Sequence, residues 1–335
     1  MNKSKITVGV DIGGTNTVFG FIKENGNYLF SNSIPTQAHE DVHTFITRLA
    51  HEIKNSFKQY ADNYILTGIG IAAPSANNFQ GTIDTPSNIK WGKVNFVTLI
   101  KKYFQIPIAI TNDANAAALG EYEFGLGKGL KNFIVITLGT GLGSGIIISG
   151  NLLYSEGGLA GEFGHTIVKP NGRLCNCHRR GCLETYASAN GICRTVLDLI
   201  ARYNEPSELQ NIPFTQMTGE IINDLALKGD HIAVKAFQYT GKILGKALAN
   251  LATSFVPEAI ILFGGLSGSG ELLLKPTRFH FEKNLLNIHK GKVKIFKSSI
   301  ENGMAAVLGA SSLVNKKINN HVMGININNN IEKNN

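Results

Sequence analysis

Cysteine and histidine residues gather in one stretch of the sequence. Cys175, Cys177 and Cys182 follow His165, and His178 lies among them. Thiolates and an imidazole are the ligands of closed, tetrahedral sites for structural zinc. Cys175 and Cys177 are separated by a single residue, a poor spacing for a disulfide that favours metal ligation. We predict a structural zinc site formed by the three cysteines with His165 as the fourth ligand, and His178 is the alternative fourth ligand.

Glycine-rich stretches at residues 11–17, 139–145 and 264–270 each follow a short apolar run. Glycine lets backbone amides approach phosphate oxygens, and a carboxylate such as Asp11 can hold Mg²⁺ through water. The second stretch has no helix pattern behind it and no lysine in the Walker position, which argues against a dinucleotide fingerprint and a P-loop. Together the three stretches resemble the phosphate and adenosine motifs of the actin, heat-shock chaperone and hexokinase superfamily. This resemblance implies a set of ATP and magnesium ligands, which are Asp11, Gly13, Gly14, Thr15, Asn16, Thr140, Gly141, Gly264 and Gly265.

Asp113 stands at the start of an alanine-rich stretch with a helical pattern. It follows Asn112 and the apolar run 106–111. The N-terminus of a helix stabilises an ionised carboxylate, which can accept the proton of an attacking hydroxyl. An N-cap is the ordinary role of such a residue, but phosphoryl transfer needs a carboxylate near the hydroxyl and little other covalent chemistry. Because phosphate-type turns surround it in the sequence, we predict Asp113 as a general base.

The apolar pattern around these residues predicts two related halves. Residues 6–10 and 18–22 are expected to form a hairpin around the first glycine-rich turn, and residues 134–136 and 146–148 repeat this plan around the second. An internal duplication is therefore expected. Two similar domains that face one another would bring both turns to one cleft.

The remaining pattern predicts alternating helices and strands. Helices are expected over residues 41–60 and 229–255, and strands over 65–72, 106–111 and 259–263. The last predicted helix, about 301–316, carries small residues that permit close packing. These are Ala305, Ala306, Gly309 and Ala310.

The chain length of 335 residues suits two α/β domains. We expect a small domain over residues 1–115 that is completed by the helix near 301–316. A large domain is expected over 116–300 and contains the zinc-binding segment 165–182. The Asn-rich run 317–335 loses periodicity and is predicted to be a disordered tail.

Composition excludes several classes of protein. With 43% hydrophobic residues the chain can bury a substantial core, and its longest apolar runs are strand-sized, so no membrane partner is expected. The net charge of +8 comes from scattered lysines and arginines, so we predict no nucleic-acid partner. The N-terminus shows no signal-peptide pattern, which favours a cytoplasmic protein.

Taken together, these motifs resemble the ROK family of bacterial sugar kinases and repressors. The resemblance runs from about Thr7 to Val314 in the family's order: Asp-Ile-Gly-Gly-Thr-Asn, Asn-Asp-x-Asn-Ala-Ala-Ala, Glu-x-Gly-His, Cys-x-Cys and Gly-Cys-x-Glu. It implies a two-domain actin-like and hexokinase-like ATPase fold, with a duplicated ribonuclease H-like motif and the active site in the cleft between the domains. It also implies ATP, Mg²⁺ and structural Zn²⁺ as cofactors and a homodimer or homotetramer.

Matching the motifs residue by residue implies a set of sugar ligands. His165 would contact both the zinc and the sugar, and Asp113 would be the catalytic base. The implied sugar-binding residues are Asn88, Asn112, Asp113, Glu162, His165 and Glu184.

Two positions depart from the family pattern. His178 stands where the family usually has glycine after Cys-x-Cys, and Ser75 stands in a Pro-Gly element of many members. We expect the first change to alter the turn beside the cysteines and the second to reshape one wall of the cleft.

The predicted function is an ATP-dependent hexose kinase that converts glucose to glucose 6-phosphate. Kinases of the same family for N-acetylmannosamine, N-acetylglucosamine or fructose are the alternatives. A sugar-sensing transcriptional regulator is less favoured, because such members carry a helix-turn-helix ahead of the phosphate turn and that turn begins here at Asp11. An actin-like ATPase without a sugar would not need Glu162, His165 and Glu184.

Overall fold

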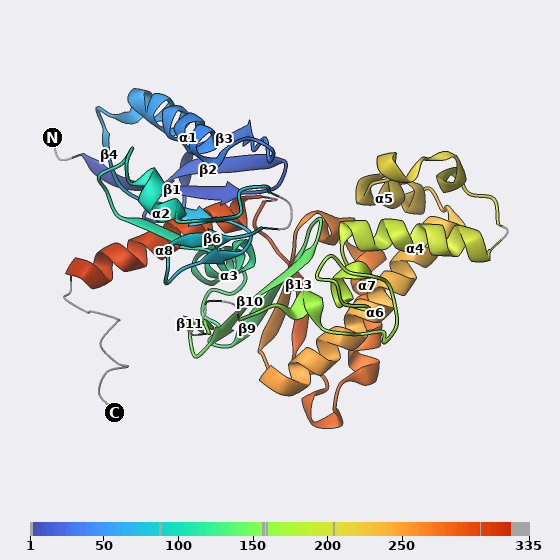
Figure 1. Cartoon of the computed structure of the whole chain (residues 1–335). Coiled ribbons are helices and arrows are strands. Elements are labelled where there is room, and N and C mark those ends of the chain that lie inside the picture. The colour runs from blue at the N-terminus through green and yellow to red at the C-terminus, as the bar shows by residue number, and fades with distance from the viewer. Residues whose placement is uncertain are drawn as a thin grey trace. The chain divides into compact units, whose positions relative to one another are not determined.

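The computed structural model describes residues 3–86, 89–155, 158, 160–203, 205–301 and 303–322. Asn88, which the family resemblance implies as a sugar ligand, lies outside the described residues. The chain forms two compact units (Figure 1). Unit 1 comprises Met1–Phe124, Tyr154–Leu159 and Gly303–Asn335, and unit 2 comprises Gly125–Leu153 and Ala160–Asn302.

Unit 1 is built on a five-stranded sheet in the order β3-β2-β1-β4-β8. The antiparallel strands are β1 (Ser4–Ile12), β2 (Asn16–Lys23) and β3 (Tyr28–Pro35), and β4 (Tyr64–Ala72) and β8 (Ile108–Thr111) run parallel to β1. A smaller sheet contains β5 (Ala76–Asn77), β6 (Thr82–Asp84) and β7 (Lys93–Val94).

Helices cover both faces of the unit 1 sheet. The even-numbered residues Ile6, Val8 and Val10 of β1 share a core with α1 (Val42–Phe57) and α2 (Phe96–Ile100). Alternate residues of a strand point to opposite faces, and Thr7 accordingly bonds Ser311 of α8 (Met304–Val322), its hydroxyl 2.7 Å from the Ser311 hydroxyl. Helix α3 (Asp113–Phe124) packs beside α8.

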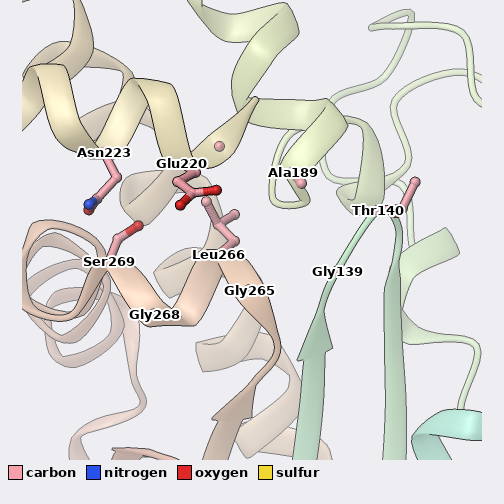
Figure 2. A pocket seen from close by; sticks show the side chains of 10 residues that line it. Gly139, Thr140, Ala189, Glu220, Asn223, Gly265, Leu266, Gly268 and Ser269 are labelled. Atoms are coloured by element: carbon pink, nitrogen blue, oxygen red, sulfur yellow. The ribbon is translucent and has the colours of Figure 1, made fainter. Parts of the chain in front are cut away.

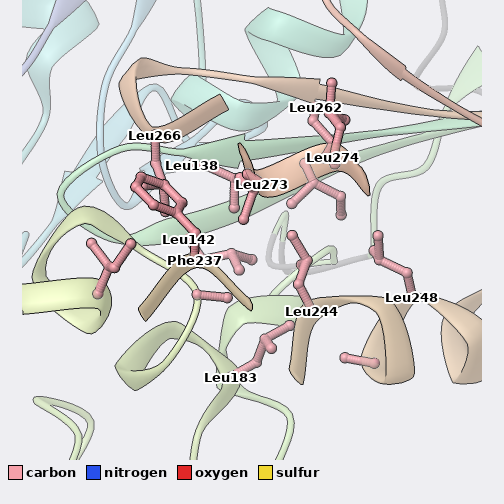
Figure 3. Packing of buried hydrophobic residues seen from close by; sticks show 14 of the residues in the cluster. Leu138, Leu142, Leu183, Phe237, Leu244, Leu248, Leu262, Leu266, Leu273 and Leu274 are labelled. Carbon is pink, nitrogen blue, oxygen red and sulfur yellow. The ribbon is translucent and has the colours of Figure 1, made fainter. Parts of the chain in front are cut away.

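Unit 2 contains a second five-stranded sheet in the order β11-β10-β9-β12-β13. Its strands are β9 (Phe133–Leu138), β10 (Leu142–Ile148), β11 (Asn151–Leu152), β12 (Ala259–Phe263) and β13 (Lys294–Lys297). Its helices are α4 (Ala189–Arg202), α5 (Gly219–Leu227), α6 (His231–Phe255) and α7 (Glu271–Asn284). Leucines such as Leu138, Leu244 and Leu273 form the core between sheet and helices (Figure 3).

The two sheets have the same plan. In each, the first strand pairs antiparallel with the second and parallel with the fourth, the second pairs antiparallel with the third, and the fourth pairs parallel with the fifth. Both hairpins carry a glycine-rich turn, between β1 and β2 and between β9 and β10. The duplication predicted from the sequence is therefore confirmed.

The division into units differs from the expected boundary after residue 115. All of α3 belongs to unit 1, because it packs closely on α8: a Cβ on Gly120 would lie 2.2 Å from the backbone oxygen of Ala305. Residues Tyr154–Leu159 also group with unit 1, although the strands before them belong to unit 2.

The last helix is longer than expected. Residues 317–322, which the Asn-rich composition assigns to a disordered tail, are instead the last residues of α8. Lys317 donates from Nζ to the carbonyl oxygen of Ile108 at 3.0 Å, and the Ile318 side chain lies against Gly68 of β4. These contacts extend the helix beyond its alanine-rich part. Among the described residues, no helix is both long and apolar enough to cross a membrane.

Candidate active site and metal-ligand cluster

Two carboxylates lie at the same edge of the unit 1 sheet. Asp11 pairs with Ala72 across β1 and β4, and Ala72 pairs with Thr111 across β4 and β8. Asp113 follows two residues after Thr111, so it and Asp11 both lie at the carboxyl ends of parallel strands, where α/β sheets bind ligands. Burial and the neighbouring charge of Asp113 raise the pKa of Asp11 to about 7.

Asp113 is held by the first turn of α3. The backbone N–H of Ala114 donates to Asp113 Oδ1 at 2.8 Å and to Asn112 Oδ1 at 2.9 Å. Burial raises the pKa of the Asp113 carboxyl, and the backbone N–H groups of Ala114 and of Asp113 itself offset part of that rise. A carboxylate with a raised pKa is a stronger proton acceptor, as a general base requires.

The first glycine-rich turn is fixed by Thr36. Its hydroxyl donates to the carbonyl oxygen of Gly13 at 2.7 Å, and its backbone N–H donates to the carbonyl oxygen of Thr15 at 2.8 Å. The Gly13 N–H also donates to the carbonyl oxygen of Asn16 at 3.0 Å. Thr15 and Asn16 remain exposed, so the turn presents both residues to a ligand. These hydrogen bonds hold the backbone of the turn.

Unit 2 contains an open pocket of about 460 Å³ (Figure 2). This volume is within the range of sites for small molecules. Four segments line it, from the second glycine-rich turn, from the first residue of α4, from α5 and from the turn after β12. The lining residues are Gly139, Thr140, Ala189, Gly219, Glu220, Asn223, Gly265, Leu266, Gly268 and Ser269.

Helix N-termini surround this pocket. Ala189 and Gly219 are the first residues of α4 and α5, and α7 begins at Glu271 directly after the lining turn. The N-terminus of a helix favours anions through its unpaired N–H groups and its dipole. Glu220 and Asn223 add a carboxylate and an amide for hydrogen bonds. The pocket can therefore hold a ligand that has both hydroxyl or amine groups and negative charge.

Of the residues predicted to bind ATP in unit 2, Thr140 and Gly265 line the pocket. Gly264 instead shapes the turn: it has φ 98°, and a Cβ there would lie 2.8 Å from the Leu138 carbonyl oxygen. The α5 residues Glu220 and Asn223 were missed by the sequence analysis. Their only signal is Thr218, which caps α5 by accepting the Ile221 N–H at 3.2 Å, and such a cap indicates a helix start and not a ligand.

The predicted zinc ligands come together in unit 2. One ligand atom from each of His165, Cys175, Cys177 and Cys182 lies within 4.8 Å of all the others. Cys175 Sγ lies 3.6 Å from His165 Nδ1, and Cys177 Sγ lies 3.5 Å from Cys182 Sγ. Tetrahedral zinc with ordinary bond lengths sets ligand separations of roughly 3.5–3.8 Å, so this donor set fits a zinc ion.

Arg179 supports the cysteine cluster. Burial raises the pKa of the Cys177 thiol, but hydrogen bonds from the backbone and guanidinium of Arg179 and with Cys182 and Cys175 together lower this pKa to about 6. Arg179 Nη2 also donates to the His165 carbonyl oxygen at 2.7 Å. The surroundings thus favour the thiolate form of Cys177, whereas burial raises the pKa of Cys175 to about 12 and also raises the pKa of Cys182.

His178 lies in the turn of the cluster and not among its four ligands. Its N–H donates to the Cys175 carbonyl oxygen at 2.9 Å, and its φ is 65°, in the left-handed region. Ser75, the second departure from the family pattern, has φ 54°. Both residues therefore adopt a conformation that glycine takes readily, and the effects expected at the cysteine turn and at the cleft wall stay predictions.

His165 connects the cluster to Glu162. While Nδ1 faces Cys175, Nε2 lies 3.9 Å from Glu162 Oε2. The short segment that carries both residues lies directly on β10, because a Cβ on Gly164 would come within 2.1 Å of the Leu142 carbonyl oxygen. The Glu162 side chain is 60% exposed.

Glu184 joins the cluster to the second glycine-rich turn. Its Oε2 accepts the backbone N–H of Leu142 at 3.0 Å, and its Oε1 lies 3.8 Å from Cys175 Sγ. A Cβ on Gly141 would lie 2.4 Å from Glu184 Oε2. The turn therefore lies close to the Glu184 carboxylate at Gly141, and Glu184 links the turn to the cysteine cluster.

The two sheets, the paired carboxylates and the glycine-rich turns define an α/β protein of the kind that binds phosphate ligands. Residues 7–317 match the ROK family. The chain belongs to this family.

Relatives in this family include both kinases and regulators. The chain is 35% identical to a glucokinase from Halalkalibacterium halodurans over 321 residues, which are 95% of this chain and 97% of that protein. The solved ROK family glucokinase from Streptomyces griseus in complex with glucose and AMPPNP has a TM-score of 0.81 at 32% identity, covering 93% of this chain and 99% of that chain. A ROK family transcriptional regulator, a homologue of the E. coli MLC protein, has a TM-score of 0.85 at 27% identity, covering 96% of this chain and 81% of that chain.

These similarities confirm the resemblance and the expected α/β kinase fold. They also show that the fold alone does not separate kinases from regulators, since the regulator has the higher TM-score and the glucokinase the higher identity. The assignment of an activity therefore depends on the site residues and on the sequence similarity to glucokinases.

Proposed function

We propose that this protein is an ATP-dependent glucose kinase that forms glucose 6-phosphate and ADP. The observation that carries the proposal is the Asp113 carboxylate at the start of α3, beside Asp11, in a chain that is 32% identical over nearly its whole length to a glucokinase solved with glucose and AMPPNP. A base beside a phosphate-type turn is the arrangement that phosphoryl transfer to a hydroxyl needs.

In the proposed reaction, Asp113 accepts the proton of the glucose 6-hydroxyl as that oxygen attacks the γ-phosphorus of ATP. The new bond joins the sugar oxygen to phosphorus, the bond between the γ-phosphorus and the bridging oxygen breaks, and ADP leaves with that electron pair. The raised pKa of Asp113 favours proton acceptance, and its hydrogen bond with Ala114 fixes the carboxylate.

ATP is proposed to bind at the pocket of unit 2. Glu220 and Asn223 offer hydrogen bonds to the base or the ribose, and the N-termini of α4 and α5 favour the negative charge of the phosphates. The exposed Thr15 and Asn16 of the first turn supply further donors.

Asp11 would hold Mg²⁺ that accompanies ATP. The two neighbouring carboxylates and the raised pKa of Asp11 fit a divalent cation, because positive charge there would relieve their repulsion. When bound, Mg²⁺ neutralises charge on the phosphates. Holding the sugar and accepting its proton are roles of the protein residues and not of the cation.

The sugar is proposed to bind through amide, carboxylate and imidazole groups. Asn112 belongs to unit 1 and Glu162, His165 and Glu184 belong to unit 2, so the proposal requires residues of both units. Polar groups that are positioned to hydrogen-bond sugar hydroxyls reject sugars that lack a matching hydroxyl. Asn88 is kept in the proposed set on the family resemblance alone.

The cluster of His165, Cys175, Cys177 and Cys182 is proposed to bind structural zinc. We expect Cys177→Ser to lose the metal and to lower the melting temperature, because a structural zinc site contributes its binding energy to folding. Cys193→Ser, which lies outside the cluster, serves as the matched control. Metal analysis of unchelated protein that finds no zinc, or equal stability of the two variants, would contradict a zinc site.

The proposal is tested by measuring ADP release with MgATP and a panel of sugars. Glucose is expected to give the fastest release, ahead of mannose, fructose, N-acetylglucosamine and N-acetylmannosamine. Faster ADP release with another sugar would mean that the protein is the kinase for that sugar within the same class. The absence of sugar-dependent ADP release, in protein shown to bind ATP, would contradict a kinase.

A sugar-responsive regulator is the second candidate, and the TM-score of 0.85 to a ROK regulator favours it. A regulator would bind sugar without turnover and would bind an operator DNA. We favour the kinase because glucokinases show the higher sequence identity. A cytoplasmic homodimer or homotetramer is the proposed state, and light scattering of the purified protein measures the assembly.

A further inference from the structure

Tyr154 contacts the residue that directly precedes the proposed site. Its hydroxyl lies 2.9 Å from Thr111 Oγ1. Thr111 is the fully buried last residue of β8, and Asn112 and Asp113 follow it immediately. Tyr154 is thus bonded to the strand end from which the proposed base emerges.

The segment that carries Tyr154 is itself anchored on unit 1. Strand β11 of unit 2 ends at Leu152, and the chain joins unit 1 from Tyr154. The ring of Phe79 meets the Tyr154 ring edge to face at a centroid distance of 5.7 Å. Gly158 has φ 73°, and a Cβ there would come within 3.3 Å of Asn77 Oδ1. The Tyr154 ring and the Gly158 backbone therefore hold this segment against the region of β5.

Thr111 is held from two directions. Its carbonyl oxygen accepts the Ala73 N–H at 3.0 Å, and it pairs with Ala72 in the sheet. Those contacts fix its backbone, and the Tyr154 hydroxyl fixes its side chain. Burial raises the pKa of Tyr154 to about 12, so this hydroxyl keeps its proton across the working range of pH.

We propose that Tyr154 is a positioning residue for Asp113. Its hydrogen bond orients Thr111, and Thr111 in turn sets the exit of the chain from β8 into α3. This inference rests on the proposed kinase function. Phosphate transfer requires the Asp113 carboxylate to lie within hydrogen-bond reach of the sugar hydroxyl. A small displacement of a reacting group lowers the rate constant more than it weakens substrate binding.

The test compares Tyr154→Phe, Thr111→Val and the double variant in steady-state assays with MgATP and glucose. Each single variant is expected to lower kcat about tenfold with little change in KM for ATP. The double variant is expected to lose no more than either single one, because both remove the same bond. Thr111→Ser keeps the hydroxyl and is expected to retain the wild-type kcat.

Tyr103→Phe is the matched control. Tyr103 makes the same kind of bond in the same unit, its hydroxyl 2.7 Å from Thr47 Oγ1, but on the outer side of α1. It is expected to leave kcat unchanged. Wild-type kcat in Tyr154→Phe, additive losses in the double variant, or an equal loss in Tyr103→Phe would overturn the positioning role.

A melting temperature measured for each variant separates positioning from general destabilisation. Tyr154→Phe is expected to melt close to the wild type, and a large fall that accounts for the lost activity would overturn the proposal. If the wild type itself showed no sugar-dependent turnover, the proposed function would fail. An active wild type with an equally active Tyr154→Phe would overturn the positioning role alone.

Discussion

Ser75 and His178 stand at the two positions where the family resemblance leads us to expect glycine. Both adopt positive φ, 54° and 65°, where side chains other than glycine are strained. His178 also donates its N–H within the cysteine turn. The surroundings therefore impose this backbone conformation, through strand contacts at Ser75 and through the cysteine cluster at His178. Each residue is strained as a result.

Replacing His178 with glycine is expected to stabilise the protein by about 0.5–1 kcal/mol. The strain of a left-handed residue, about 1–2 kcal/mol, is partly offset by the greater freedom of glycine in the unfolded chain. Thermal or denaturant unfolding measures the change. The control is His51→Gly within α1, which is expected to destabilise by about 1 kcal/mol or less, as glycine does in a helix. A destabilised His178→Gly would contradict the strain.

The neighbouring carboxylates Asp11 and Asp113 make the stability of the folded protein depend on pH. The folded-state pKa of Asp11, about 7, lies above the value of 3.8 for a free carboxyl, so the folded protein binds this proton more tightly than the unfolded chain. Its contribution to stability is therefore greatest below pH 3.8 and is lost as the pH rises through about 7. Ionised Asp11 therefore does not contribute to the stability of the fold.

Asp11→Asn is consequently expected to raise the melting temperature at pH 8, measured without Mg²⁺ or nucleotide. At pH 5, where Asp11 is already protonated, the gain is expected to be much smaller. The comparison of wild type and variant by calorimetry at both pH values checks this. A variant that melts below the wild type at pH 8 would show that the ionised carboxylate stabilises the fold.

At the scale of elements, glycines in two strands of unit 1 allow α8 to lie directly on the sheet. A Cβ on Gly9 of β1 would come within 1.9 Å of the Val307 carbonyl oxygen, and one on Gly70 of β4 within 1.7 Å of the Ala310 carbonyl oxygen. Those oxygens belong to helix backbone, which cannot move aside as a side chain can. The small residues Ala306 and Ala310 on α8 complete this close packing.

Gly70→Ala is expected to destabilise the protein by at least about 2 kcal/mol, since overpacking against backbone cannot be relieved by a rotamer change. Denaturant unfolding gives the free energy. Gly219→Ala is the stability control, because a Cβ there meets only the Leu266 side chain at 3.8 Å and Ala189 at 4.0 Å. Near wild-type stability of Gly70→Ala would mean that α8 does not approach β4 this closely.

At the scale of the whole molecule, the sequence predicted the duplicated plan because glycine-rich turns and apolar runs are local signals. The cluster of candidate metal ligands was predictable for the same reason, since Cys175, Cys177 and Cys182 are close in the chain. The full set of residues that line the pocket was not predictable from the sequence. Glu220 and Asn223 lie far in sequence from Thr140 and Gly265, and only the packing of α5 brings them together.

Long-range packing also explains the differences in domain limits. Helix α3 belongs to unit 1 because Gly120 and Gly309 let α3 and α8 touch, and α8 extends to Val322 because Lys317 and Ile318 reach the sheet. Neither contact can be recognised from a pattern in a short stretch of the sequence. The Tyr154 segment returns to unit 1 for a similar reason, through Thr111 and Phe79.

The central claim, that Asp113 is the base in phosphate transfer to glucose, is tested most directly by single-turnover transfer from labelled MgATP in wild type and Asp113→Asn. Binding of ATP and of glucose is measured in the same preparations. The wild type is expected to form glucose 6-phosphate, and the variant is expected to bind both ligands and to transfer at least about a hundredfold more slowly. A variant that transfers at the wild-type rate, or a wild type that binds both ligands and forms no glucose 6-phosphate, would contradict the account.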